Sequence, residues 1–352
     1  MKKIIKKNIS RRDFIKNSAL GVVGVAMSGE LLNGEKVKAG SSSGLKKSSV
    51  VVVRHSGVIK SSGELKQDIV DMMVAKGIVE FTCVNNESEA WRKFYSPGDM
   101  IGLKVNTLGL NAIRGSGWVN HFSAVTGSVA RGLRNSGHSE ENIIVWDRSD
   151  GELENAGFKL SKDPAKMMVS GILASRRDDK GDLYTKKSFK VGDKSVRLAK
   201  ILTEKCSTLI NIPLIKHHRN AGVTGAMKSH FGTIDNPFEF HSPGCVNPGI
   251  PEINALPEIK NKQKLIVVDG LMGLFDGGPW WDRRFVFPFG RIIIGTDPVA
   301  VDSVILGILD EKRKDAGKEP LAPKVKFLEL SEKLGLGNSK KENIEIKELI
   351  LG

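Results

Sequence analysis

STLINIPLIKHHRNAGVTGAMKSHFG, residues 207–232, is the stretch around which this chain is built. Its first part, Ser207–Ile212, is a short apolar run that predicts a buried strand ending before Pro213. We expect Thr224 to cap a helix that Gly232 ends. In open α/β sheets ligands bind at the carboxyl ends of the strands, and the amides at the start of the following helix favour an anion. A binding site is therefore expected here.

Further apolar runs outside this stretch predict other strands of the same sheet. They are Ser49–Arg54, Met100–Asn106, Ile143–Asp147, Lys264–Asp269, Arg291–Gly295 and Ile344–Leu351. Helical spacing of apolar residues occurs at Leu65–Ala75 and from about Asn120 to Asn135. The alternation predicts an α/β fold: a mostly parallel sheet flanked by helices on both faces. Residues 151–200 are less regular and predict a small β-containing insertion.

The amino-terminal segment carries a twin-arginine export signal. Residues 10–16 read SRRDFIK, follow four lysines and precede an apolar run from Ala19 to Met27. That run is too short and too rich in glycine to span a membrane, so no permanent membrane span is expected. We predict a signal peptide at residues 1–39, a flexible linker at 40–48 and a single α/β domain at 49–352. The twin-arginine translocase is the expected partner during export, and the periplasm the expected location.

Charge and cysteine usage narrow the classes of partner. The net charge is +14, but residues 1–39 hold nine Lys/Arg and three Asp/Glu, which leaves +8 for the rest. Lysines are spread along the chain and aromatic residues make up 6%, so a nucleic-acid groove is not expected. A small anionic ligand fits this charge better. Cys83, Cys206 and Cys245 form no CxxC pattern, so these cysteines do not supply an iron–sulfur cluster.

Polar residues gather where the predicted strands end, and we divide them by the chemistry that they offer. Imidazole, amine and carboxylate groups suited to acid–base catalysis are His217, His218, Lys228 and Asp269. Groups suited to binding an anionic substrate are Lys104, Asn106, Lys216, Thr224, Gly225 and Asp297. His218 and Asp276 are the candidate metal ligands, because imidazole with carboxylate suits zinc, iron or nickel. Asp297 equally fits a helix cap before Pro298, and Asp302 a buried partner for a basic group.

Four segments together resemble the domain of unknown function 362 family. They are MIGLKVN (100–106), IKHHRNAGVTGAMKSHFG (215–232), IVVDGLMGLFDGGP (266–279) and IIIGTDPVAVDSVILGIL (292–309). The resemblance extends over nearly all of the chain after residue 39. Other members of that family carry an added ferredoxin-like cysteine module, which this chain lacks.

Two functions from different classes fit these observations. The first is an exported metal- or cofactor-dependent enzyme that acts on a small anionic substrate at the strand carboxyl ends. The second is a periplasmic binding or accessory protein that holds an anionic ligand without reaction. No GxSxG motif occurs, which disfavours a covalent serine hydrolase.

Overall fold

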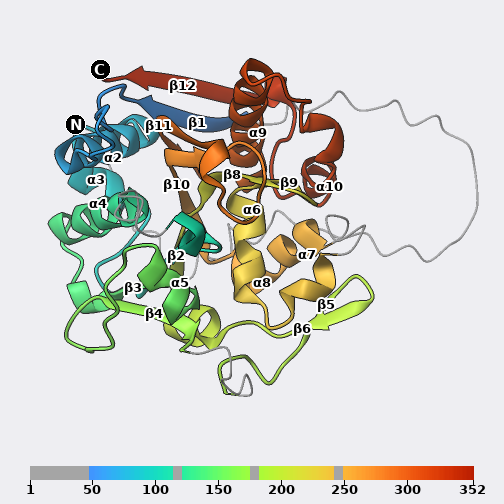
Figure 1. Ribbon diagram of the computed structural model, residues 1–352. Helices are drawn as coiled ribbons and strands as arrows, with labels where there is room; N and C mark the ends of the chain where they lie inside the picture. Colours follow the sequence, from blue (N-terminus) through green and yellow to red (C-terminus); the bar gives the residue numbers. More distant parts are fainter. Residues whose placement is uncertain (1–46, 114–120, 175–181, 242–248) are drawn as a thin grey trace, which may run out of the picture. The chain divides into compact units, whose positions relative to one another are not determined.

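The computed structural model describes residues 47–113, 121–174, 182–241 and 249–352. In it, runs of β-branched and apolar residues form the central strands of one mixed sheet (Figure 1). The strands in sheet order are β12 (Ile344–Ile350), β1 (Ser48–Arg54), β11 (Val286–Gly295), β10 (Gln263–Leu274), β7 (Thr208–Ile212), β2 (Ile101–Val105), β3 (Ile143–Ser149) and β4 (Met168–Leu173). Each strand predicted from the sequence is present. The predicted signal peptide lies outside the described residues.

Most neighbouring strands of this sheet run parallel. β12 pairs parallel with β1, and β10, β7, β2, β3 and β4 follow one another in parallel. β11 is antiparallel to both of its neighbours, β1 and β10. The predicted α/β fold with a mostly parallel sheet is therefore confirmed.

Helices cover both faces, because successive side chains of a strand point to opposite sides. In β1, Val51 and Val53 pack with Met73 of α2 (Gln67–Thr82), and Val50 and Val52 belong to the opposite core. The first face also holds α3 (Glu87–Arg92) and α4 (His121–Asn135), and the other holds α9 (Pro298–Asp315) and α7 (Gly249–Ala255) (Figure 1). Shorter helices are α5 (Asp150–Asn155), α8 (Pro257–Lys260) and α10 (Phe327–Lys333). No helix of the described ranges is long and apolar enough to cross a membrane.

The irregular region, residues 151–200, contains an antiparallel pair of strands and one strand of the main sheet. β5 (Phe189–Val191) and β6 (Lys194–Val196) form a separate two-stranded sheet. β4, in contrast, comes from the same region and extends the main sheet beside β3. The sequence analysis did not predict β4, because the surrounding region is rich in lysine.

The sequence predicted a helix after β7, but the chain does not lead directly into one. It first forms a hairpin of β8 (Leu214–His218) and β9 (Gly222–Thr224), and β8 pairs parallel with β10. A single helical turn, α6 (Ala226–Ser229), and a 3-10 turn, η4 (His230–Thr233), then follow. Both histidines of the pair therefore lie in a strand.

The predicted cap at Thr224 is wrong, because a distant carboxylate occupies that place. Asp302 of α9 accepts hydrogen bonds from the amides of Ala226, at 2.6 Å, and Met227, at 3.1 Å. A Cβ atom on Gly225 would lie 2.1 Å from Asp302 Oδ1, so glycine is needed for this approach. The first amides of α6 thus bind the protein's own carboxylate and not an external anion.

Candidate functional site

A cavity of about 570 Å³ opens at the carboxyl ends of β2, β3 and β4 and beside β8. Six of the predicted site residues line it: Lys104, Asn106, Lys216, His218, Thr224 and Lys228. We call it the lysine cavity, after Lys104, Lys216 and Lys228. Strand carboxyl ends meet at one edge of a parallel sheet, and this is the reason that side chains far apart in sequence converge here.

Lys104 and Asp147 form a buried ion pair in the wall of the lysine cavity. Lys104 Nζ donates to Asp147 Oδ1 at 2.7 Å and to the Val105 carbonyl at 2.6 Å. Asp147 Oδ2 accepts from the amide and the hydroxyl of Thr107, at 2.7 and 2.6 Å. Burial raises the pKa of Asp147, but the charge and hydrogen bond of Lys104 and the bonds from Thr107 lower it overall. The pair is held ionised and joins two strands.

Lys216 is a buried amine that makes no ion pair with a carboxylate among the residues that the structure describes. Its side chain is 1% exposed, and Nζ donates to the Leu108 carbonyl at 2.7 Å. Nζ also lies 5.6 Å from the ring centre of Trp281. Burial, followed by the charge of Lys228, lowers the pKa of Lys216 from 10.5 to about 7. Near neutral pH this amine can therefore both accept and release a proton.

His218 is held as a neutral ring that offers a hydrogen-bond donor. Its Nδ1 accepts from the amides of Asn220 and Ala221, both at 3.2 Å, so the ring hydrogen lies on Nε2. Burial, followed by the charge of Lys228, lowers the pKa of His218 to about 2. Because Nε2 already carries its hydrogen, the expected role of His218 as a general base or metal ligand does not fit this geometry.

Lys228 reaches the cavity beside a second imidazole. Its Nζ lies 3.2 Å from His241 Nε2 and 4.1 Å from the ring centre of Phe231. His241 Nδ1 is 2.7 Å from the Pro237 carbonyl, to which it donates, so its Nε2 accepts from the ammonium. The rings of His218 and His241 are 5.6 Å apart. His241 therefore orients Lys228 within the cavity.

Three buried polar atoms of cavity-lining residues lack hydrogen-bond partners in the described part of the chain. They are His218 Nε2, Thr224 Oγ1 and Ser229 Oγ. Buried polar groups are normally hydrogen-bonded, because an unpaired one costs about 1–3 kcal/mol. All three belong to residues that line the one cavity, so they are available to a polar ligand or to water.

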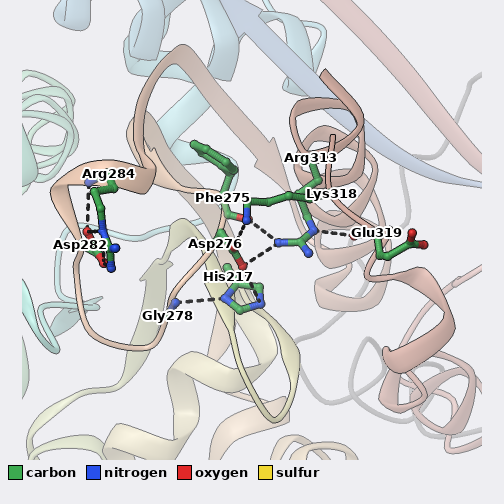
Figure 2. Close-up of polar contacts among 9 residues, drawn as sticks. All are labelled: His217, Phe275, Asp276, Gly278, Asp282, Arg284, Arg313, Lys318 and Glu319. Carbon is green, nitrogen blue, oxygen red and sulfur yellow. Dashed lines mark hydrogen bonds and ion pairs between the residues drawn. The ribbon is translucent and has the colours of Figure 1, made fainter. Parts of the chain in front are cut away.

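His217 faces away from the lysine cavity, because neighbouring residues of a strand point to opposite sides. Figure 2 shows its ring beside Asp276 and Gly278. His217 Nδ1 accepts from the Gly278 amide at 3.0 Å, and Nε2 lies 3.9 Å from Asp276 Oδ1. Burial lowers the pKa of His217 to about 4, although Asp276 acts in the opposite direction. The structure thus separates the two histidines that the sequence had grouped.

Asp276 belongs to an ion-pair cluster on the His217 side. Arg313 Nη1 lies 2.9 Å from Asp276 Oδ1, and Lys318 Nζ lies 2.6 Å from Oδ2 (Figure 2). The predicted metal pair His218 and Asp276 is not brought together, since these residues line different cavities. Within the described ranges no group of three His, Cys, Asp or Glu side chains is arranged to hold a metal ion.

Three other predicted site residues lie outside the lysine cavity. Asp269 is buried in β10, where Oδ1 accepts from the Leu271 amide at 3.1 Å, and burial raises its pKa to about 7. Asp297 caps α9 by accepting from the amides of Val299 and Ala300, at 2.8 and 2.9 Å. Gly225 packs against Asp302 as described above. The structure gives Asp297 and Gly225 structural positions and places Asp269 within the core.

His241, Phe231 and Arg148 line the lysine cavity but were not among the predicted site residues. His241 ends the 3-10 turn η5 (Pro237–Phe240), in a proline-rich segment whose length was its only sequence signal. Arg148, near the end of β3, forms an ion pair with Glu152 of α5. Cys83 is exposed and Cys206 buried, and both are unpaired; Cys245 lies outside the described residues.

Comparison with known proteins adds a family but no activity. The curated proteins contain no match to this sequence. A crystal structure of a protein from Thermotoga maritima matches with a TM-score of 0.38 and 12% sequence identity. The match covers 76% of this chain and 59% of that chain, so this chain spans less than two thirds of that protein. Because this TM-score is low, the fold assignment rests on the strand order and pairing. The model of the family described as Domain of unknown function (DUF362) matches residues 101–307, more than half of the sequence, and the chain belongs to this family.

Proposed function

We propose that this protein is an enzyme that binds a small organic anion in the lysine cavity and transfers a proton to or from it. The observation that carries the proposal is Lys216, a buried amine with a pKa of about 7 and no ion-pair partner among the described residues. Strongly perturbed groups in a cavity are typical of acid–base catalysts. A metal has no part in this proposal.

The charges of the cavity favour an anionic ligand. The three carboxylates that line it in the described part of the chain already have basic partners: Asp147 pairs with Lys104, Glu152 with Arg148 and Asp235 with Arg197. Lys216 has no such partner among the described residues, and the charge of Lys228 lowers its pKa. A carboxylate between the two lysines would relieve their repulsion.

The remaining contacts suggest how such a ligand is oriented. A carbonyl or carboxylate oxygen can accept hydrogen bonds from His218 Nε2–H and from the Thr224 hydroxyl, both of which lack partners among the described residues. A neutral imidazole with a low pKa polarises a carbonyl as a hydrogen-bond donor. Trp280 and Phe231 offer apolar surface for the rest of the ligand. Lys216, as the neutral amine, would then remove a proton from the carbon beside the polarised carbonyl.

The alternative, a binding protein without catalysis, uses the same contacts. It is favoured by the three buried atoms without partners, since a ligand satisfies them whether or not it reacts. The two functions differ in what Lys216 does. For binding alone its charge matters, whereas for catalysis its proton transfer matters.

The test measures hydrogen–deuterium exchange at carbon by NMR, with pyruvate, malonate and related carbonyl acids as probes in deuterated buffer. The wild type is expected to bind one of them and to accelerate exchange beside its carbonyl. Lys216→Met should reduce exchange by about 100-fold or more, the usual contribution of a general base. Lys190→Met, an exposed lysine of β5, is the control and should leave exchange unchanged.

The outcomes separate the two functions. Saturation-transfer signals without exchange in the wild type would favour the binding protein. Exchange that survives in Lys216→Met would remove Lys216 from the reaction. If no carbonyl acid binds, the assignment of the cavity to an organic anion fails.

We also propose that the chain is exported folded to the periplasm by the twin-arginine translocase. The support is the SRRDFIK sequence at residues 10–16 and the apolar run that follows. Replacement of Arg11 and Arg12 with lysine should retain the protein in the cytoplasm. Export of this variant at the wild-type level would contradict the proposal.

A further inference from the structure

A second cavity, of about 270 Å³, lies on the opposite side of β8 from the lysine cavity. Its charged lining residues are Arg219, Asp276, Arg313 and Lys324, and His217 completes the wall. We call it the arginine cavity, after Arg219 and Arg313. The proposed reaction makes no use of these side chains.

Arg313 is a buried side chain of the arginine cavity that hydrogen bonds hold in position. It is 8% exposed, and its Nη1 bonds the Phe275 carbonyl at 3.0 Å and Asp276 Oδ1 at 2.9 Å. Nε donates to the Glu319 carbonyl at 2.8 Å (Figure 2). Nη2 makes no hydrogen bond to the described residues. Arg313 is thus fixed in place and retains donor capacity.

The positive charge of the arginine cavity exceeds its negative charge. Asp276 is the only carboxylate among the described residues that line this cavity, and it already forms ion pairs with Arg313 and Lys318. Arg219 and Lys324 also line the cavity, and neither makes an ion pair within the described ranges. Two cations are therefore left without a counter-charge beside a fixed guanidinium.

We propose that the arginine cavity binds a phosphate-sized anion, either free inorganic phosphate or the phosphate of a small phosphomonoester. Guanidinium groups present forked donors that match phosphate oxygens, and Arg219 and Arg313 flank the same space. Lys324 adds a point charge. A cavity of about 270 Å³ admits such an anion but leaves little room for a larger organic group.

This site is distinct from the proposed substrate site. His217 faces the arginine cavity, and its neighbours Lys216 and His218 face the lysine cavity. The segment after β10 also divides between them, since Gly277 and Gly278 line the first and Pro279 and Trp280 the second. The inference therefore does not depend on the proposed enzymatic function.

The experiment is a titration of the full chain with inorganic phosphate, followed by ³¹P NMR and calorimetry at low ionic strength. The wild type is expected to bind, and Arg219→Gln with Lys324→Gln to weaken binding by about tenfold or more, because each removed group bonds a charged ligand. Both side chains are exposed and unpaired in the described structure, so the variant should fold normally, as circular dichroism can verify. Tighter binding of methyl phosphate than of phosphate would identify a phosphomonoester as the ligand.

Lys216→Met serves as the matched control in the other cavity and should leave phosphate binding unchanged. Loss of binding in Lys216→Met, with retention in the Arg219 and Lys324 variant, would assign phosphate to the lysine cavity and overturn the inference. Absence of binding by the wild type at millimolar phosphate would overturn it as well. Neither result would bear on proton exchange by Lys216, so the two proposals fail separately.

Discussion

Replacing Lys216 with methionine is expected to make the folded protein more stable at neutral pH. Burial and the nearby charge of Lys228 lower the pKa of Lys216 from 10.5 to about 7. Between these two pH values the unfolded chain binds more protons than the folded chain, so stability rises as pH rises through the window. The shift corresponds to a penalty of about 5 kcal/mol, which is fully present below pH 7 and absent above pH 10.5.

The net effect of the substitution follows from two opposing contributions. Methionine removes the penalty but also loses the hydrogen bond from Nζ to the Leu108 carbonyl, worth about 1–3 kcal/mol. We therefore expect the variant to gain about 2 kcal/mol at pH 7. As pH approaches 10.5, the wild type loses its penalty and the variant should become the less stable protein. The difference thus changes sign with pH.

Urea unfolding of both proteins at a series of pH values from neutral to alkaline measures this difference directly. Lys190→Met, an exposed residue of β5, is the control, and its effect on stability should stay within about 0.5 kcal/mol. A Lys216→Met variant that is less stable than the wild type by the same amount at every pH would refute the reasoning. It would mean that Lys216 stays charged and stabilised in the folded protein.

Three further predictions concern His218, the close approach at Gly225 and the ion pair of Lys104. His218 should show the Nε2–H tautomer by ¹⁵N NMR and no titration near its ordinary pKa of 6.5, and a protonated ring at mildly acidic pH would contradict the assigned tautomer. Gly225→Ala should lower the free energy of unfolding by about 2 kcal/mol, because the new Cβ would lie 2.1 Å from Asp302 Oδ1; an unchanged urea midpoint would argue against this contact. Lys104→Met should lower the free energy of unfolding by about 3–5 kcal/mol, because Asp147 is then buried without its ion-pair partner. A loss no larger than that from breaking an exposed ion pair would show that Asp147 is solvated.

The strands were predictable because each carries its own signal. β1 and β3 are continuous apolar runs, and the acid before Pro298 marks the start of α9, where Asp297 caps the helix. The hairpin of β8 and β9 was not predictable. Lys216, His217 and His218 read as a polar loop, and only pairing with β9, and with β10 at Lys216, makes them a strand.

The convergence of the site was also predictable in part. Lys104 lies in β2, Lys216 in β8 and Lys228 in α6, and the carboxyl ends of parallel strands bring such residues to one edge. The roles of the two histidines were not predictable, because a one-residue step in β8 sends their rings into different cavities. The tautomer of His218 depends on the amides of Asn220 and Ala221.

The positions of the apolar strands along the chain and several of the polar residues near their ends were predicted from the sequence alone, because apolar patterning and helix caps are local properties. The tertiary structure alone decided that Asp302 caps α6, that Asp276 is paired with Arg313 and that Lys216 has no ion-pair partner among the described residues. These outcomes depend on burial and on partners distant in sequence. Burial and these distant partners determine the pKa and the hydrogen bonds of a side chain, and no local sequence pattern encodes them.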